Sequence, residues 1–159
     1  VRAPFPYAYG GYAWYDLGTV GRPAPVRFPQ SYARLLATVD ELRARPDVDP
    51  GRVILFGFSM GAVMSLARAL TRPELFRAVS ANSGYLPEGA ALAFRPDAAG
   101  HLDILVAHGT ADPLVPVTLG RAARDYLMTT NARVLYREYP MAHGIGPESL
   151  ADIGAWLGA

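Results

Sequence analysis

The feature that most constrains the fold is a serine between two glycines, Gly57-Phe58-Ser59-Met60-Gly61. An apolar run at residues 53–56 precedes it and a helix-like stretch at residues 62–70 follows it. This order predicts a strand, a sharp turn and a helix, with the serine at the turn. A side chain held on such a strained turn needs neighbours without a Cβ atom where the backbones crowd. The serine hydroxyl should therefore project from the strand end, beside the positive end of a helix. In a glycine-rich chain the same letters also fit a plain turn with a solvent-facing serine, so other residues must decide.

The composition narrows the class of protein. The 159 residues suffice for one domain, residues 1–159, with a core of its own. The formal net charge is +1 with both signs mixed along the chain, which argues against nucleic acid or an anionic membrane as a partner. No apolar run approaches the ~18 residues of a membrane span. The chain starts without a signal-peptide pattern, so we expect a cytoplasmic protein. Cysteine is absent, which excludes disulfides, thiolate metal sites and a cysteine nucleophile.

The order of predicted elements favours an α/β fold. Residues 1–30 are rich in Pro, Gly and Tyr and are predicted to form a long ordered loop. A helix is expected over 32–45, with Ser31 as its N-cap, residues 35, 36, 39 and 42 on its buried face and Pro46 as its stop. Strands are expected at 53–57, 77–81, 104–106 and 134–139, and helices at 62–71, 119–128 and 147–157. Short apolar strands alternating with amphipathic helices predict a parallel sheet covered on both faces. In such sheets ligands bind at the carboxyl ends of the strands.

His143 is the predicted base for Ser59. A serine hydroxyl needs a base to remove its proton and a third group to orient that base. In this type of fold the order along the chain is serine, acid, histidine. His101 precedes its strand, at the wrong edge of the sheet, and His108 would have to precede the acid. His143 follows the strand at 134–139 and is downstream of every strong acid candidate. The alternative for His143 is a surface loop histidine.

Asp112 is the predicted acid. It comes just past the strand at 104–106, at the carboxyl edge. Asp103 opens that strand at the other edge, Asp125 lies within a helix, and Glu138 sits inside a strand beside a basic residue. Taken alone, Asp112 before a proline would be an ordinary turn or capping residue. Its place between the serine and the histidine favours the triad Ser59, Asp112 and His143.

With these residues in place, the chain resembles the phospholipase/carboxylesterase family of α/β-hydrolases, which includes acyl-protein thioesterases and small bacterial carboxylesterases. The matching segments span nearly the whole chain. They are Arg2-Ala3-Pro4, the stretch 11–16, the stretch 49–53, the serine motif at 57–61, Ser83-Gly84-Tyr85-Leu86-Pro87, the stretch 108–116 and the stretch 139–144.

The resemblance implies hydrolysis of carboxylic esters or thioesters with no metal and no organic cofactor, on a small-molecule substrate. It implies that the backbone amide of Met60 supplies one oxyanion donor. It also implies that Trp14, Leu114 and Val115 line the substrate site, with Met60 a further candidate. Trp14 could equally be an aromatic that only covers a sheet edge.

The resemblance also predicts a departure at the amino terminus. Members of the family carry strands before the Arg2-Ala3-Pro4 point, with a His-Gly loop that donates a second oxyanion amide. We therefore expect an N-terminally truncated α/β-hydrolase sheet with an open edge at strand 53–57, and a weak esterase. A homo-oligomer or partner covering that edge is a further expectation. A non-catalytic fragment stays open as the alternative, as do peptide or lactone substrates. Dienelactone-type hydrolases would prefer cysteine at position 59.

Overall fold

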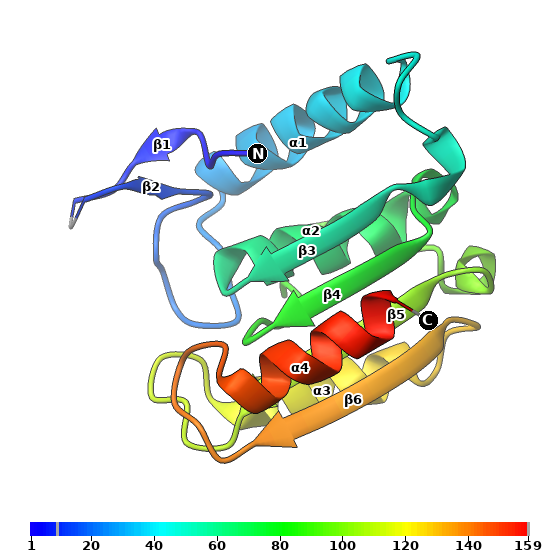
Figure 1. Ribbon diagram of the computed structural model, residues 1–159. Coiled ribbons are helices and arrows are strands. Elements are labelled where there is room, and N and C mark those ends of the chain that lie inside the picture. The colour runs from blue at the N-terminus through cyan, green and yellow to red at the C-terminus, as the bar shows by residue number, and fades with distance from the viewer. Residues whose placement is uncertain (9, 159) are drawn as a thin grey trace.

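Four parallel strands form the centre of the molecule. The computed structural model describes residues 1–8 and 10–158. Its sheet has the order β3 (Ile54–Phe58), β4 (Ala78–Asn82), β5 (Asp103–Gly109) and β6 (Arg133–Tyr139), and every neighbouring pair is parallel (Figure 1). All five residues of β4 are buried, as expected for an inner strand of a covered parallel sheet.

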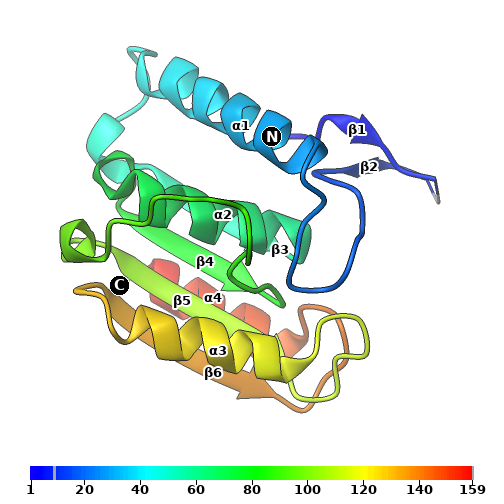
Figure 2. The ribbon, with the colours of Figure 1, turned by 180° about the vertical axis from the view of Figure 1, so that it is seen from behind.

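Helices cover both faces of this sheet, which confirms the predicted α/β class. Helices α2 (Met60–Thr71) and α3 (Val117–Leu127) lie on one face, and α4 (Pro147–Leu157) lies on the other (Figures 1 and 2). The first helix, α1 (Arg27–Arg43), packs beside α2 at one end of the sheet. Within the described residues, no helix is long and apolar enough to cross a membrane.

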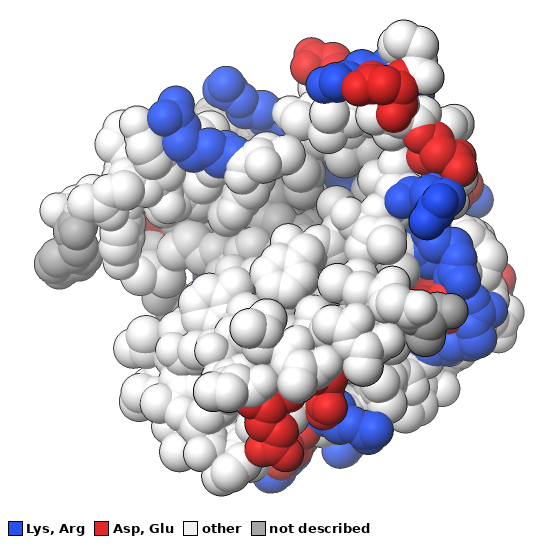
Figure 3. Space-filling view, viewed as in Figure 1, with Lys and Arg blue, Asp and Glu red and all other residues white. Residues whose placement is uncertain are grey.

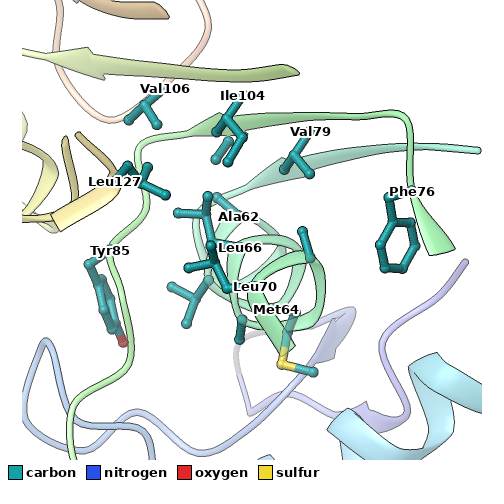
Figure 4. Close-up of a cluster of buried hydrophobic side chains, with 14 of the residues drawn as sticks. Ala62, Met64, Leu66, Leu70, Phe76, Val79, Tyr85, Ile104, Val106 and Leu127 are labelled. Carbon is teal, nitrogen blue, oxygen red and sulfur yellow. The ribbon is translucent and has the colours of Figure 1, made fainter. Parts of the chain in front are cut away.

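The core lies between α2 and the inner strands. Residues 62–70 of α2 are all buried, because this helix is enclosed by the sheet on one side and by α1 on the other. Figure 4 shows Ala62, Leu66 and Leu70 of α2 in one buried cluster with Val79 of β4 and Ile104 of β5. Burying an aliphatic side chain of this kind contributes about 1.5–3 kcal/mol. The α2–sheet contact therefore holds Ser59, which directly precedes α2, in a rigid setting.

The amino-terminal segment departs from the prediction. Within the expected loop, β1 (Phe5–Pro6) pairs antiparallel with β2 (Tyr12–Ala13). The predicted N-cap at Ser31 is wrong, because α1 already begins at Arg27 and accommodates Pro29 in its first turn. Instead, Ser31 is fully buried and donates a hydrogen bond to the backbone carbonyl of Trp14. Its hydroxyl therefore ties α1 to the segment after β2.

The other end of α1 also differs. The helix ends at Arg43, two residues before the predicted boundary, with Ala44 as its C-cap. Leu42 was expected on the buried face but is 37% exposed. The covered stripe of α1 consists of Phe28, Ser31, Leu35 and Val39. The predicted helical spacing of the buried residues is confirmed, but the buried stripe ends at Val39, one turn before the predicted Leu42.

Strand β3 is an edge strand, as predicted. It pairs with β4 alone, and its side chains alternate between the two faces of the sheet. On the face away from α2, Ile54, Phe56 and Phe58 are 43%, 52% and 37% exposed. The face viewed in Figure 3 carries few charged side chains at its centre. An unpaired edge beside exposed apolar side chains is a surface on which another strand can pair.

Candidate active site

Ser59 has the strained backbone expected of a serine at a strand-to-helix turn. Its φ is 54° and its ψ is −121°, in a region that non-glycine residues rarely adopt. Its N–H donates to the carbonyl of Asn82 in β4 at 2.9 Å. The turn therefore follows directly from the end of β3, and α2 begins at the next residue, Met60.

The two glycines of the motif have different roles. A Cβ on Gly57 would lie 2.3 Å from the carbonyl oxygen of Gly61, so only glycine fits at position 57. A Cβ on Gly61 would meet only the indole Nε1 of Trp14, at an ordinary 3.8 Å. The predicted steric reason thus applies to the first glycine. At the second glycine it is the backbone carbonyl of Gly61 that packs closely against Gly57.

A short hydrogen bond joins His143 to Asp112. The imidazole Nδ1–H of His143 donates to Oδ2 of Asp112 at 2.7 Å, and the Asp112 side chain is fully buried. The other carboxylate oxygen, Oδ1, accepts the backbone N–H groups of Leu114 at 2.9 Å and Val115 at 2.8 Å. Because an ionised carboxylate only accepts, the proton must lie on Nδ1 of His143, and Nε2 keeps its lone pair. This is the tautomer that a general base requires.

Hydrogen bonding keeps Asp112 ionised in spite of its burial. Burial by itself would raise the pKa of Asp112, because it removes water from the charged form. The N–H of Val115, the imidazole of His143 and the N–H of Leu114 outweigh that effect and hold the pKa below its ordinary value. The carboxylate is therefore available as a negative charge beside the imidazole.

Close backbone packing brings the Asp112 and His143 loops together. A Cβ on Gly109, the last residue of β5, would lie 2.3 Å from the carbonyl oxygen of Met141. The N–H groups of Thr110 and Ala111 donate to carbonyls of the β6 exit, at 2.8 and 3.1 Å. These bonds extend the β5–β6 pairing beyond the strands. As a result, the loop after β5 and the loop after β6 form one unit at the carboxyl edge.

An apolar cavity of about 420 Å³ opens beside the serine. Ser59 and His143 both line it, together with Met60, Leu114 and Val115. The remaining lining residues come from β2, the segments before and after it, and the loop after β4: Tyr7, Tyr12, Ala13, Tyr15, Leu17, Gly18, Thr19, Val20, Arg22 and Tyr85. Trp14 is half-buried and is not among these residues. The predicted contact of Trp14 with substrate therefore stays a prediction.

The histidines and acids that the sequence analysis set aside all have other contacts. His101 contacts the carbonyl of Pro73 at 3.0 Å, before β5 begins. Asp103 is paired with Arg77 and Arg133, and Glu138 with Arg121. Asp125 is paired with Arg124. Within the described part of the chain, no cluster of three His, Asp or Glu side chains could hold a metal ion.

His108 is a buried neighbour of the site whose position the sequence reasoning did not foresee. Its side chain has no exposed surface, and its Nε2–H donates to the carbonyl of Val115 at 2.8 Å. The same nitrogen lies 3.7 Å from Oδ2 of Asp112. Among the described residues its Nδ1 has no hydrogen-bond partner, and a Cβ on Gly120 of α3 would stand 2.4 Å from it. The sequence feature that could have indicated this burial is the position of His108 at the end of a strand, four residues before Asp112.

Comparison with known proteins places this arrangement in a family. The phospholipase/carboxylesterase family matches residues 2–159. The chain belongs to that family. Its fold is similar to that of solved structures: SOBER1 of Arabidopsis thaliana superposes with a TM-score of 0.82 at 24% identity, covering 98% of this chain and 80% of that one. A carboxylesterase from Mesorhizobium loti superposes with a TM-score of 0.86 at 20% identity, covering 99% and 73%.

Curated relatives of the family are longer than this chain. A probable carboxylesterase of rice (Oryza sativa subsp. japonica) is 28% identical in an alignment 154 residues long, which covers 91% of this chain and 57% of the rice protein. Acyl-protein thioesterase 1 of Debaryomyces hansenii is 31% identical over 155 residues, covering 91% of this chain and 67% of the yeast protein. The chain thus spans little more than half the length of the rice relative.

Proposed function

We propose that this chain is a serine hydrolase that cleaves carboxylic esters through an acyl-enzyme intermediate. The observation that carries the proposal is the hydrogen bond of 2.7 Å between His143 and Asp112, with His143 and the strained Ser59 both lining one cavity. Thioesters are a second substrate class, because a triad of this kind does not itself select the leaving group. The printed names of the relatives include carboxylesterases and thioesterases, which supports the same chemistry.

The proposed reaction proceeds in two steps. Nε2 of His143 takes the hydroxyl proton of Ser59 as the serine oxygen attacks the carbonyl carbon of the ester. The tetrahedral intermediate collapses, His143 returns the proton to the leaving alcohol or thiol, and the acyl group stays on Ser59. A water molecule then loses its proton to His143 and attacks the acyl-enzyme, which releases the acid and restores Ser59. Asp112 stabilises the imidazolium formed in both steps.

The backbone of α2 offers one donor for the oxyanion. Met60 is the first residue of α2, so its N–H has no partner within the helix and lies at the positive end of the helix dipole. We assign it the role of an oxyanion donor. The loss of one such donor typically lowers kcat by about 10²–10³. If no second donor is supplied, we expect the chain of residues 1–159 to be a weak esterase.

The cavity residues beside the triad would hold the substrate. Leu114 is 62% exposed and Val115 is 7% exposed, so these two neighbours reach from the cavity mouth to its wall. They lie two and three residues after Asp112, and their N–H groups hold its carboxylate. One short loop thus holds the Asp112 carboxylate in place and also supplies apolar side chains to the cavity. An apolar acyl or alcohol group of the substrate fits such a cavity better than a charged group does.

A second reading is a chain that needs a partner strand for activity. The exposed edge of β3 with Ile54, Phe56 and Phe58 specifically favours it. In this reading, a second copy or another strand-bearing segment pairs with β3, and the isolated chain turns over little substrate. Both readings leave Ser59 in the same cavity. They differ in the turnover expected of the isolated chain, which is low if a partner strand is needed.

The test is hydrolysis of p-nitrophenyl butyrate, together with covalent labelling by a fluorophosphonate. Wild type is compared with Ser59→Ala, His143→Ala and the control Thr118→Ala, an exposed hydroxyl outside the cavity. We expect hydrolysis and labelling in wild type and Thr118→Ala, and neither in the other two variants. Labelling with little turnover would support the partner-dependent reading. Equal background rates and no labelling in all four proteins would contradict the hydrolase proposal.

A further inference from the structure

The inner wall of the cavity carries a pair of buried phenols. The hydroxyl oxygens of Tyr15 and Tyr85 lie 3.2 Å apart, and the two residues are separated by 70 positions in the sequence. Tyr15 is 1% exposed and Tyr85 is 7% exposed, whereas the lining residues Leu17 and Leu114 are more than half exposed. The phenol pair thus lies at the inner end of the cavity, and the exposed leucines lie at its mouth.

Counting hydrogens leaves one donor of this pair without an acceptor. Each phenol has one hydrogen to donate and an oxygen that can accept. Between Tyr15 and Tyr85 only one hydrogen can be shared, so one O–H must point elsewhere. Among the described residues, no other hydrogen bond of either phenol is found. A buried donor without an acceptor is costly, so a site that keeps one leaves it for water or a ligand.

The relative burial of the two residues indicates which O–H is free. Tyr15 packs against Phe28 with ring centroids 5.4 Å apart, and among the described residues the hydroxyl of Tyr15 has one hydrogen-bond partner, the Tyr85 oxygen. The distance allows either phenol to donate, and we assign the donor role to Tyr15 because it is the more deeply buried of the two. Both residues line the cavity, but Tyr85 is the more exposed of the two, and Figure 4 shows its hydroxyl directed away from the sheet. Its hydrogen is the one that faces the cavity.

The surroundings select a neutral acceptor. Burial, followed by the neighbouring Tyr85 phenol, raises the pKa of Tyr15, so the Tyr15 phenol keeps its hydrogen and can donate it. The one charged residue among those that line the cavity in the described chain is Arg22, and its guanidinium is paired with Glu88. Both partners are largely exposed, at 72% and 64%, so the inner end of the cavity is free of charge. An ether, hydroxyl or carbonyl oxygen of a ligand matches that environment.

We propose that Tyr85, supported by Tyr15, determines substrate specificity by donating a hydrogen bond to an oxygen in the part of the ester that enters the cavity. The site then prefers esters with an oxygen-bearing acyl or alcohol group over plain alkyl esters of the same length. This inference rests on the proposed ester hydrolysis at Ser59. It adds a polar contact to a cavity whose lining surface is mostly apolar.

The test replaces single methylene groups of the substrate by oxygen. One series consists of p-nitrophenyl hexanoate and its analogues with an ether oxygen at successive chain positions. A second series consists of hexyl acetate and the acetate esters of the corresponding ether alcohols. An ether oxygen accepts a hydrogen bond and is close to a methylene in size. In one series, we expect one position to raise kcat/KM about 3- to 10-fold in wild type, the effect of one ordinary hydrogen bond. The series that responds shows whether the acyl or the alcohol side enters the cavity.

Tyr85→Phe should abolish this preference, while hydrolysis of the plain alkyl ester continues. Comparing oxygen-to-alkyl ratios between variants cancels the intrinsic reactivity of each ester. Tyr15→Phe should keep most of the preference, because the Tyr85 hydrogen remains. Tyr126→Phe, on α3 and outside the cavity, is the matched control and should keep all of it. A purely structural role of Tyr85 would change all esters alike.

The outcomes separate this inference from the proposed function. Ser59-dependent cleavage of alkyl esters with no favoured oxygen position would overturn the inference and leave the hydrolase intact. A preference that survives in Tyr85→Phe would also overturn it. Absence of Ser59-dependent cleavage of any ester would overturn both. The wild-type series alone decides the first of these points, even if Tyr85→Phe does not fold.

Discussion

Replacing Asp112 by asparagine changes one atom of the site and should remove most of the activity. The amide oxygen of Asn can take the place of Oδ1 and accept the N–H groups of Leu114 and Val115, now at 2.9 and 2.8 Å. The NH₂ group then replaces Oδ2, which lies 2.7 Å from Nδ1 of His143. Two donors cannot face each other, so His143 must present a lone pair at Nδ1 and carry its proton on Nε2. That nitrogen is the one that has to accept the proton of Ser59.

The magnitude follows from this change of tautomer. The same substitution in the triad of a serine protease lowers kcat by about 10⁴. This factor corresponds to about 5 kcal/mol at 1.36 kcal/mol for each tenfold change in rate. The fold should lose less, because hydrogen bonds to a charged acceptor contribute about 1.5–3 kcal/mol and neutral ones about 0.5–1.5 kcal/mol. We therefore expect Asp112→Asn to unfold at a lower urea concentration than wild type but to remain folded in buffer.

The assay is kcat for p-nitrophenyl butyrate, with urea unfolding of the same preparations. Asp152→Asn is the matched control, since Asp152 also accepts a side-chain hydrogen bond, from the Tyr139 hydroxyl at 2.9 Å, but lies outside the cavity. It should keep near wild-type turnover. If Asp112→Asn keeps more than about a tenth of the wild-type kcat while Ser59→Ala is inactive, then Asp112 does not orient the base and the argument fails.

Three other predictions concern stability and assembly. Because the folded pKa of Asp112 is lowered, its contribution to stability is present above its unfolded pKa of about 4 and is lost as pH falls through the folded value. Urea unfolding of wild type and Asp112→Asn should therefore converge in acid, and a constant difference down to pH 2 would contradict this. Gly57→Ala should destabilise the fold by at least about 1–3 kcal/mol, because its Cβ would lie 2.3 Å from backbone, whereas Gly61→Ala should be tolerated; equal melting temperatures would refute the contrast. Phe56→Lys, on the exposed β3 edge, should reduce any self-association seen by analytical ultracentrifugation, and unchanged association would place the contact elsewhere.

The sheet and its helices could be predicted because their signals are local. The strand at 134–139 and the helix at 147–157 were predicted within one residue of β6 and α4, since apolar periodicity and proline positions mark them. The start of α1 could not be found in this way. Ser31 has the residue type of an N-cap, yet its hydroxyl bonds the Trp14 carbonyl from inside the helix. Only the position of a segment 17 residues away decides between those two uses.

The triad residues were chosen by topology, and the structure brings two of them into hydrogen-bond contact. The rule that parallel strands present their carboxyl ends at one edge was enough to pair Asp112 with His143. It could not predict how the two loops dock, because that docking depends on backbone contact at Gly109, where a Cβ would lie 2.3 Å from the Met141 carbonyl oxygen. Nor could it predict that His108 would be fully buried 3.7 Å from Asp112. Such contacts depend on where a glycine faces a neighbouring segment, as Gly109 faces the loop after β6 and Gly120 faces the His108 ring.

The cavity is the feature that sequence patterns describe least well, because its wall comes from segments without a regular period. Tyr15 and Tyr85 each stand in a stretch that is readable only as loop, and neither stretch indicates a partner for its phenol. The inference that one phenol hydrogen is free requires knowing that Tyr15 and Tyr85 are hydrogen-bonded to each other, which the sequence does not indicate. Substrate preference in this chain should therefore depend on the residues after β2 and after β4, while the chemistry depends on the strand ends. Changes at Tyr85 should accordingly alter which ester is cleaved, and changes at His143 should alter whether any ester is cleaved.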